Sequence, residues 1–107
     1  MINAKEELQH EIYYKLQENV KVLCGYVEYK NEEYLLPVNY TELDTKEFLN
    51  NLNFKYDDGY GIQELFGVIW ITDDSWFERR EYDGAEWWQH MTRPSIPDKL
   101  LNGTENA

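Results

Sequence analysis

The chain has 107 residues, 42% hydrophobic and 16% aromatic, which is a common size for one domain and enough apolar material for one core. Its 21 acidic residues against 10 basic ones give a net charge of −11, and 15 of the acids but only 5 of the bases lie from Glu28 through Glu86. Because a negative field repels nucleic acids and anionic membranes, we expect neither as a direct partner.

No segment approaches the roughly 20 apolar residues of a membrane span, and the first residues lack the pattern of a secretory leader. We therefore expect a soluble protein of the cytoplasm. Cys24 is the single cysteine and lies in an apolar run, so we interpret it as a structural thiol rather than a reactive or disulfide-bonded one.

Two helices are predicted in the first half of the chain. Asn3, followed three residues later by Glu6, has the pattern of a capping box and predicts a helix over 4–18. The apolar stripe of this helix comprises Leu8, Ile12, Leu16 and Val20. Asp44 and Glu47 repeat the same spacing, so we expect a second, short helix to begin at Asp44.

A β-hairpin is predicted between these helices. Residues 20–29 and 34–38 are rich in β-branched and aromatic side chains, and 30–33 have the composition of a turn. Because Pro37 cannot donate a hydrogen bond to a neighbouring strand, we expect the second strand of this hairpin to lie at an edge of its sheet.

The second half predicts a three-stranded antiparallel meander after a loop over 57–61. Its strands are expected at 64–72, 75–82 and 85–91, with turns at Asp73-Asp74 and Asp83-Gly84. The whole chain therefore predicts an α+β fold, with a single domain over 1–97 and a flexible tail over 98–107.

The Asp83-Gly84 turn also predicts the register of the last hairpin. A two-residue turn places Tyr82 opposite Ala85, and it brings Arg79 and Arg80 opposite the indole rings of Trp88 and Trp87. The same register, continued through Asp73-Asp74, predicts one face with Trp70, Phe77, Arg79, Trp88 and His90. The other face is predicted to hold Ile69, Ile71, Trp76, Arg80, Trp87 and Met91.

Neither predicted face is cleanly polar. We therefore expect the first helix to cover one face, and the other to be partly exposed or to lie against a second copy of the chain in a homodimer. A tryptophan and arginine cluster is typical of both a cross-strand ladder that fixes register and an interaction hot spot.

The sequence offers little support for catalysis, a metal or another cofactor. His10 and His90 have no third ligand at metal-binding spacing. A hydrolase that uses Glu78, Glu81 and Glu86 is the alternative considered, but arginines beside these glutamates favour permanently ionised carboxylates over an acid and base pair. We therefore expect a protein that is not an enzyme and has no cofactor.

The segment from Gly67 through Pro97 resembles a family of small acidic phage and prophage proteins of unknown function. That family carries a D-x-S-W turn, then E-R-x-E-Y-D-G-x-E-W-W, then P-x-I-P. The matching stretches here are 73–76, 78–88 and 94–97, although Asp74 stands where the resemblance leads us to expect glycine. The resemblance implies a phage or mobile-element origin, and such proteins often block host defence nucleases by occupying a basic groove.

Charge and resemblance together predict an inhibitor of a basic host nuclease or CRISPR effector, or of a restriction enzyme, whose acidic surface imitates DNA. The residues predicted to contact this partner are Glu32, Glu33, Asp57, Asp58, Asp73, Asp74, Asp83, Glu86 and Trp88. The alternative is a structural or adaptor protein that dimerises or docks a phage or host component through the aromatic face of its sheet.

Overall fold

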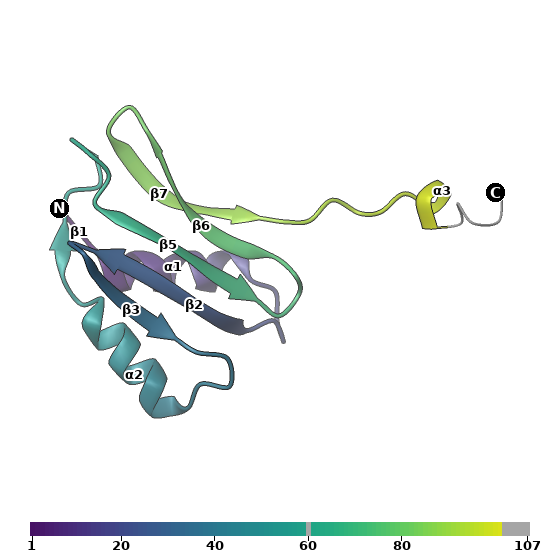
Figure 1. The fold of residues 1–107 in the computed structure, drawn as a ribbon, viewed down its shortest axis with the longest axis horizontal. Helices are drawn as coiled ribbons and strands as arrows, with labels where there is room; N and C mark the ends of the chain where they lie inside the picture. The colour runs from purple at the N-terminus through teal and green to yellow at the C-terminus, as the bar shows by residue number, and fades with distance from the viewer. Residues whose placement is uncertain (60, 102–107) are drawn as a thin grey trace.

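A five-stranded antiparallel sheet of order β3-β2-β5-β6-β7 forms the centre of the fold (Figure 1). The computed structural model of the protein describes residues 1–59 and 61–101. The strands of this sheet are β2 (Val22–Tyr29), β3 (Glu32–Leu36), β5 (Leu65–Ile71), β6 (Trp76–Tyr82) and β7 (Ala85–Met91). Because β2 pairs with β5 from Val22 to Tyr29, the predicted hairpin and the predicted meander join into one sheet, and the α+β class is confirmed.

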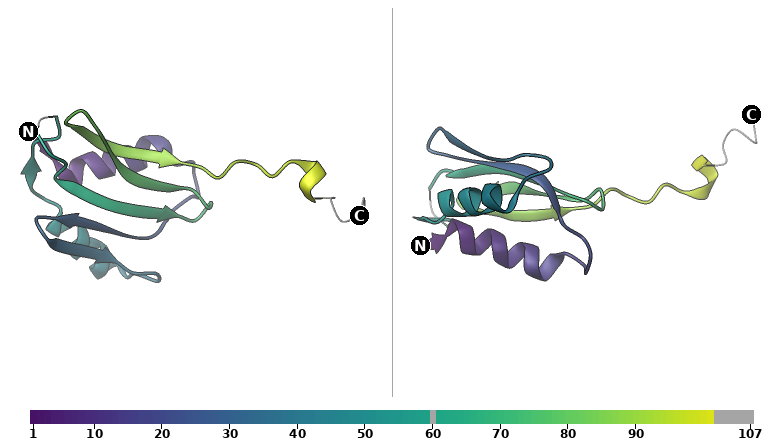
Figure 2. Two further views of the ribbon diagram at one scale, coloured as in Figure 1. Left: turned by 45° about the horizontal axis from the view of Figure 1, so that its top comes forward. Right: turned by 90° about the horizontal axis from the view of Figure 1, so that it is seen from below.

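Helices α1 (Ala4–Lys15) and α2 (Glu42–Asn51) pack on one face of this sheet (Figure 2). The side chain of Asn3 caps α1 as predicted, since it accepts a hydrogen bond of 3.0 Å from the amide of Glu6. The helix ends at Lys15 rather than at residue 18, because Leu16 already has an extended backbone, with φ of −87° and ψ of 139°. The core between helices and sheet includes Leu8, Val27, Leu36, Phe48, Leu52, Leu65, Ile69 and Phe77.

The cap of α2 differs from the prediction. Thr41, rather than Asp44, is the N-cap residue, and Asp44 is the third residue of the helix. The Thr41 hydroxyl accepts a hydrogen bond of 3.1 Å from the Asp44 amide, and the Asp44 carboxylate accepts one of 2.9 Å from the Thr41 amide. The pattern from 41 to 44 satisfies both backbone groups, so the spacing from Asp44 to Glu47 has no capping role.

A second, two-stranded sheet was not predicted. It consists of β1 (Ile2–Asn3) and β4 (Lys55–Tyr56), which pair antiparallel. Two residues per strand are too few to show a hydrophobic period in the sequence. This small sheet holds Tyr56 against the start of α1, where it takes part in the buried polar network described below.

The β2–β3 turn is shorter than predicted. Lys30 and Asn31 both have positive φ, as a two-residue hairpin turn requires, so the expected four-residue turn is wrong. Glu32 and Glu33 therefore belong to strand β3, although both are exposed. The predicted edge position near Pro37 is confirmed, because β3 is the first strand of the sheet and Pro37 follows it directly.

The predicted register between β5 and β6 is wrong by one residue. Trp70 pairs with Trp76 and Ile69 with Phe77, because Asp74 adopts a left-handed φ of 69° and the turn takes up an extra residue. A shift of one residue exchanges the two faces of a strand. The isoleucines of β5 consequently face the helices together with Phe77, and Trp70 lies on the opposite face.

The last hairpin has the predicted register. Tyr82 pairs with Ala85 and Arg79 with Trp88. Both turn residues, Asp83 and Gly84, have positive φ, which is the conformation of a type I′ turn.

After β7 the chain leaves the domain as an extended arm, which we define as residues 92–101 (Figure 1). All ten residues are exposed, and the last four form the short helix α3 (Asp98–Leu101). The predicted tail thus begins with a helical turn, while its residues 102–107 lie outside the described part of the chain. None of the described helices combines the length and the apolar character needed to cross a bilayer.

Candidate functional site

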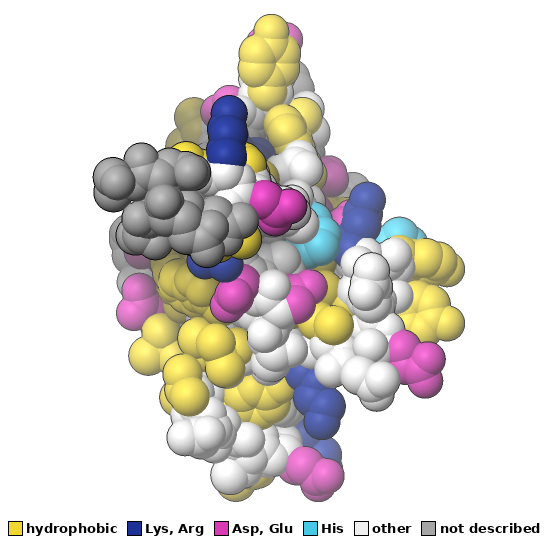
Figure 3. Space-filling view, turned by 90° about the vertical axis from the view of Figure 1, so that its right-hand side faces the viewer, with side chains coloured by type: hydrophobic (Ala, Val, Ile, Leu, Met, Phe, Trp, Pro, Cys, Tyr) yellow, Lys and Arg dark blue, Asp and Glu magenta, His cyan; other side chains and the backbone are white. Residues whose placement is uncertain are grey.

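The nine residues predicted to contact a partner do not form one surface. At the end of the sheet where β5 begins lie Glu32, Glu33, Asp57, Asp58 and Asp83. Asp73 and Asp74 lie at the opposite end, in the turn that follows β5. In the view along the arm, acidic side chains are interspersed with basic and apolar ones among the described residues (Figure 3). The acidic turns are thus divided between two ends of the domain.

The remaining two residues, Glu86 and Trp88, are interior. Their exposed fractions are 3% and 4%, so neither side chain is accessible to a partner in this conformation. Both point to the helix-covered side of the sheet, as does Arg79 on the neighbouring strand, which is 8% exposed. Their role is therefore in the core of the fold.

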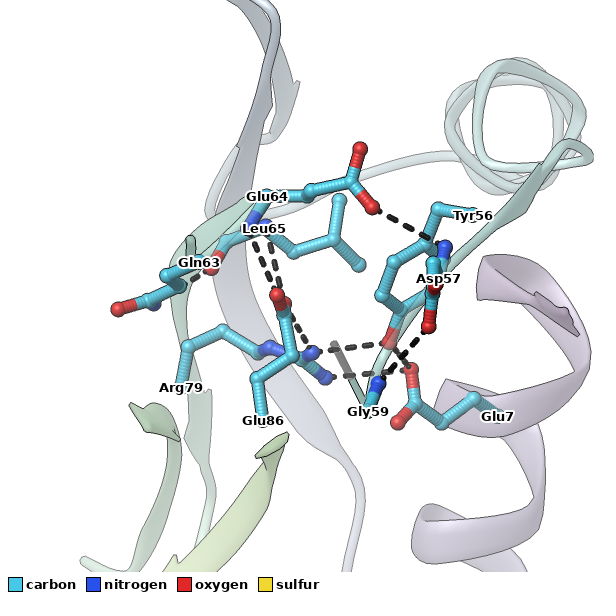
Figure 4. A network of polar contacts seen from close by, with 9 residues as sticks. All are labelled: Glu7, Tyr56, Asp57, Gly59, Gln63, Glu64, Leu65, Arg79 and Glu86. Carbon is cyan, nitrogen blue, oxygen red and sulfur yellow. Dashed lines mark hydrogen bonds and ion pairs between the residues drawn. The ribbon is translucent and has the colours of Figure 1, made fainter. Parts of the chain in front are cut away.

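Arg79 and Glu86 form the centre of a buried polar network (Figure 4). The Nη2 atom of Arg79 lies 2.5 Å from a carboxylate oxygen of Glu86 and also donates to the Tyr56 hydroxyl at 2.8 Å. Its Nη1 atom donates to the carboxylate of Glu7 on α1 at 3.1 Å, and the Tyr56 hydroxyl donates to the same Glu7 oxygen. The network therefore connects α1, β4, β6 and β7.

Glu86 also holds the chain that enters β5. Its two carboxylate oxygens accept hydrogen bonds from the backbone amides of Glu64 and Leu65, at 2.7 and 3.0 Å. The Glu86 amide in turn donates to the carbonyl of Asp58 at 2.8 Å. One side chain thus fixes the loop before β5 against the last strand of the sheet.

Burial governs the ionisation of this network. Burial raises the pKa of the Glu7 carboxyl above its ordinary value, against the opposing charge of Arg79. Burial and the hydrogen bond to Glu7 also raise the pKa of Tyr56, which keeps its hydroxyl a donor. Burial acts to lower the pKa of Arg79, but Glu7, Tyr56 and Glu86 outweigh it and raise the pKa, so the guanidinium stays charged.

This network has the properties of a structural anchor. The side chains of Arg79, Glu7 and Glu86 are only 1%, 10% and 1% exposed, so they are closed to a substrate. The guanidinium also lies over the rings of Trp88 and Tyr56, at 5.2 and 5.6 Å. The predicted contact between Arg79 and Trp88 is confirmed, and its surroundings indicate a role in packing.

A second polar cluster consists of Asp73, Ser75 and His90, which are the residue types of a Ser-His-Asp catalytic triad. Here the serine, and not the histidine, is the middle member of the hydrogen-bonded chain. The Ser75 hydroxyl donates to Asp73, and a nitrogen of His90 lies 3.0 Å from the same hydroxyl oxygen. Because the single hydroxyl proton is directed at Asp73, His90 is a donor to Ser75 and does not activate it as a base. Among the described residues, no group of three His, Cys, Asp or Glu side chains is arranged to hold a metal.

The side of the sheet away from the helices carries the exposed aromatic residues, and we call it the open face. From the strand registers, its residues are Cys24, Tyr26, Glu28, Glu33, Leu35, Phe66, Val68, Trp70, Trp76, Glu78, Arg80, Tyr82, Ala85, Trp87, Gln89 and Met91. Phe66, Trp70 and Trp87 are 44%, 41% and 37% exposed, and Leu35 is 61% exposed. An apolar area of this kind on a small protein is typical of an interaction surface.

Neighbouring polar groups hold two indole rings of the open face, those of Trp76 and Trp87, in place. Trp76 donates to Glu78 at 2.8 Å and Trp87 donates to Gln89 at 3.1 Å, each two residues along the same strand. Glu78 also pairs with Arg80 at 3.0 Å. Both arginines were predicted to contact indole rings. The contact is observed for Arg79 on Trp88, whereas Arg80 pairs with Glu78. Fixed aromatic rings lose little freedom when a partner covers them.

Two hollows indent the open face. One of about 450 Å³ lies over β6 and β7 and is lined by Arg80, Tyr82, Trp87 and Met91 among others. Another, of about 330 Å³, includes Glu28 and Phe66 at the end of the sheet where β5 begins. The face therefore combines shallow depressions with exposed aromatic rings.

Glu28 and Glu33 give this face an unbalanced negative charge. They are directly opposite each other on β2 and β3, which is a destabilising arrangement for two like charges. The ion pairs found among the described residues involve Arg79 and Arg80 and leave both glutamates without a basic partner.

A further apolar groove of about 360 Å³ lies between α1, α2 and the sheet, lined by Leu8, Ile12, Phe48 and Leu49 among others. Two of its polar groups are already used, since the Tyr40 hydroxyl donates to the carbonyl of Val22 and Thr45 bonds to the carbonyl of Thr41. Gln9 and Tyr13 also line the groove, and both are exposed.

Part of the open face was predicted. Trp76, Arg80, Trp87 and Met91 were expected on one face, and the structure places them there. Trp70 was predicted on the other face, with Phe77 and Arg79, and this was wrong because the register between β5 and β6 is shifted by one residue. Phe66 was not assigned to a face, because β5 reads as a continuous apolar run in which alternation does not distinguish the two faces. Comparison of the chain with family models, curated proteins and solved structures found no match.

Proposed function

We propose that this protein is a non-enzymatic binding protein that docks a basic protein partner on the open face. The observation that carries the proposal is the set of exposed aromatic residues, Phe66, Trp70 and Trp87, on a sheet face that no helix of the described chain covers. Tryptophan and tyrosine are the residues that contribute most at protein interfaces, because they bury a large area with few rotatable bonds.

The charge of the chain supports the basic character of the partner. A net charge of −11 accelerates association with a positive surface and repels acidic competitors. The uncompensated pair Glu28 and Glu33 places part of this charge on the open face itself. Acidic turns at both ends of the sheet contribute to the long-range field.

A narrower form of the proposal concerns the identity of the partner. The resemblance of 67–97 to phage proteins and the acidity of the chain support a host nucleic-acid-binding defence protein in the host cytoplasm, either a CRISPR effector or a restriction enzyme. Such an inhibitor blocks its target by occupying a basic surface that otherwise binds DNA. In this form the open face provides affinity and the acidic turns provide repulsion of the nucleic acid.

The test is capture by the tagged protein from a bacterial lysate that contains both defence systems, with salt-gradient elution and identification of the partner by mass spectrometry. Trp87→Ala is expected to abolish capture. Tyr13→Ala is the matched control, because Tyr13 is 77% exposed on α1, away from the open face. The captured protein is then assayed for DNA binding with and without the inhibitor.

Two results decide between the forms of the proposal. Equal capture by the Trp87→Ala and Tyr13→Ala proteins would exclude the open face as the binding site. Capture that depends on Trp87 but leaves DNA binding by the partner intact would retain the docking function and refute the inhibitor.

A further inference from the structure

The arm contains a segment with the chemistry of a peptide ligand. Residues 93–97 read Arg-Pro-Ser-Ile-Pro, with two prolines three positions apart. A polyproline II helix has three residues per turn, so Pro94 and Pro97 share one edge of an extended backbone. Both residues are exposed, and Ile96 between them is 49% exposed. Aromatic surfaces recognise such segments because proline has already restricted the backbone and little entropy is lost on binding.

The arm also differs in charge from the domain that carries it. Arg93 and Lys99 outnumber Asp98, so the arm has a net charge of +1. Residues 1–91 contain 19 acidic and 8 basic side chains and have a net charge of −11. The arm is therefore electrostatically complementary to a domain like its own.

The open face has the features that such a segment requires. The exposed rings of Trp87 and Phe66 each line one of the two hollows, which offer room for proline and isoleucine side chains, and Trp70 is a further exposed ring of the face. Glu28 and Glu33 face each other without a basic partner and are the acceptors for a guanidinium. A single arginine between two carboxylates would remove their mutual repulsion.

The length of the arm matches the width of the face. Six extended residues span about 20 Å, and the four residues of α3 add about 6 Å. Five strands at about 4.8 Å spacing form a sheet roughly 20 to 24 Å wide. One arm is therefore long enough to cross one open face.

The direction of the arm favours a second molecule over its own domain. The arm continues outward from the end of β7 and does not fold over the sheet (Figures 1 and 2). Pro94 restricts Arg93 to an extended conformation, so a reversal onto the same open face would have to occur almost entirely at Thr92. A second copy meets the arm without any such reversal.

We infer that the arm of one copy binds across the open face of a second copy, with Arg93 between Glu28 and Glu33 and the 94–97 segment on the aromatic rings. This inference rests on the proposed function, because it uses the same face, and it identifies basic, proline-containing extended segments as the class of ligand that the face accepts. The homodimer regulates that face, since an external partner competes with the arm.

The contact between copies is tested by paramagnetic relaxation in a mixed sample of full-length chains. One chain is unlabelled, carries Cys24→Ser and Asp98→Cys, and bears a spin label on the new thiol. The other is ¹⁵N-labelled and carries Cys24→Ser alone, so every broadened amide reports a contact between molecules. Because residue 98 follows Arg93 across the sheet in the direction of β7, we expect broadening on β5, β6 and β7, at residues of the open face. Broadening confined to α1 and α2, or no broadening together with a monomer at all concentrations, would overturn the inference.

A charge exchange tests the pairing itself in full-length protein. We expect Arg93→Glu to weaken the dimer by about tenfold or more, as measured by sedimentation, because the ion pairs are replaced by repulsion. Lys99→Glu changes the charge of the arm by the same amount outside the 93–97 segment and is expected to have a much smaller effect. Adding Glu33→Lys to Arg93→Glu is expected to restore the dimer. Equal weakening by both single variants would refute the pairing.

Failure of this inference and failure of the proposed function give different results. If the arm makes no contact with a second copy while capture of the partner still depends on Trp87, the arm proposal alone fails. If the arm contact is observed but partner capture is insensitive to Trp87, the face is a dimer surface and the proposed function fails.

Discussion

Replacing Arg79 with methionine tests whether the buried network anchors the fold. Arg79→Met has similar length and no charge, so it leaves the Glu7 and Glu86 carboxylates facing each other in the core without their cation. Removal of one partner from a buried ion pair costs about 3 to 5 kcal/mol, because the remaining charge is desolvated and uncompensated. The hydrogen bond to Tyr56 is lost as well.

Urea unfolding followed by tryptophan fluorescence measures this loss. With a urea dependence of about 1 to 3 kcal/mol per molar, the midpoint is expected to fall by about 1 to 5 M. The neighbouring Arg80→Met is the matched control, since Arg80 is 47% exposed in its side chain and its surface pair with Glu78 is worth about 0 to 1 kcal/mol.

The pH dependence gives a second criterion. Without the guanidinium, no positive charge opposes the burial of Glu7, so the folded state favours its protonated carboxyl and the variant should regain stability relative to the natural protein as the pH falls from 7 toward 5. If Arg79→Met and Arg80→Met differ by less than about 1 kcal/mol at pH 7, the anchor described above is wrong.

Two further predictions concern single residues of the fold. Gly67→Ala is expected to destabilise the protein by about 1 to 3 kcal/mol in thermal or urea unfolding. The added methyl group would lie 2.4 Å from the carbonyl oxygen of Tyr26 and 3.1 Å from the Trp88 ring. Gly59→Ala is the control and should have a much smaller effect, because there is open space around Gly59. The pKa of Glu7 is raised in the folded state above its ordinary value of 4.5. Its contribution to the free energy of unfolding is therefore favourable below pH 4.5 and is lost as the pH rises through the pKa of the folded state. Stability curves of Glu7→Gln should therefore lack the decline with rising pH that begins near 4.5, and an unchanged slope would contradict the assignment.

The last hairpin was predictable because its structure is encoded locally. Asp83-Gly84 specifies a type I′ turn, and a two-residue turn determines every pairing from Tyr82 with Ala85 to Arg79 with Trp88. The preceding turn was not predictable in the same way. Asp74 adopts a conformation for which glycine is the usual residue, and the one-residue shift that results reverses the faces of β5.

The role of Glu86 was not predictable from local pattern. Besides Arg79, it accepts from the backbone amides of Glu64 and Leu65, which are 22 and 21 residues away in the sequence. The other groups that Arg79 contacts are more distant still, since Glu7 is 72 residues from Arg79. A signal was nevertheless present, because Arg79 shares one face of β6 with Phe77, and an arginine on an apolar face requires a buried acidic partner. Glu81 and Glu86 both share this face of the hairpin with Arg79, so alternation limits the partner to these two acids but does not choose between them.

The connection of α1 to the final hairpin has a consequence for synthesis on the ribosome. The N-terminal helix emerges first, but the strands that complete its packing, β6 and β7, are translated last. Contacts between residues so far apart in the sequence form slowly, because a long loop must close before they can stabilise the fold. The nascent chain therefore lacks its native tertiary structure until nearly the whole domain has been translated, and a chain that stalls before residue 85 leaves Glu7 and the core leucines exposed to chaperones and proteases.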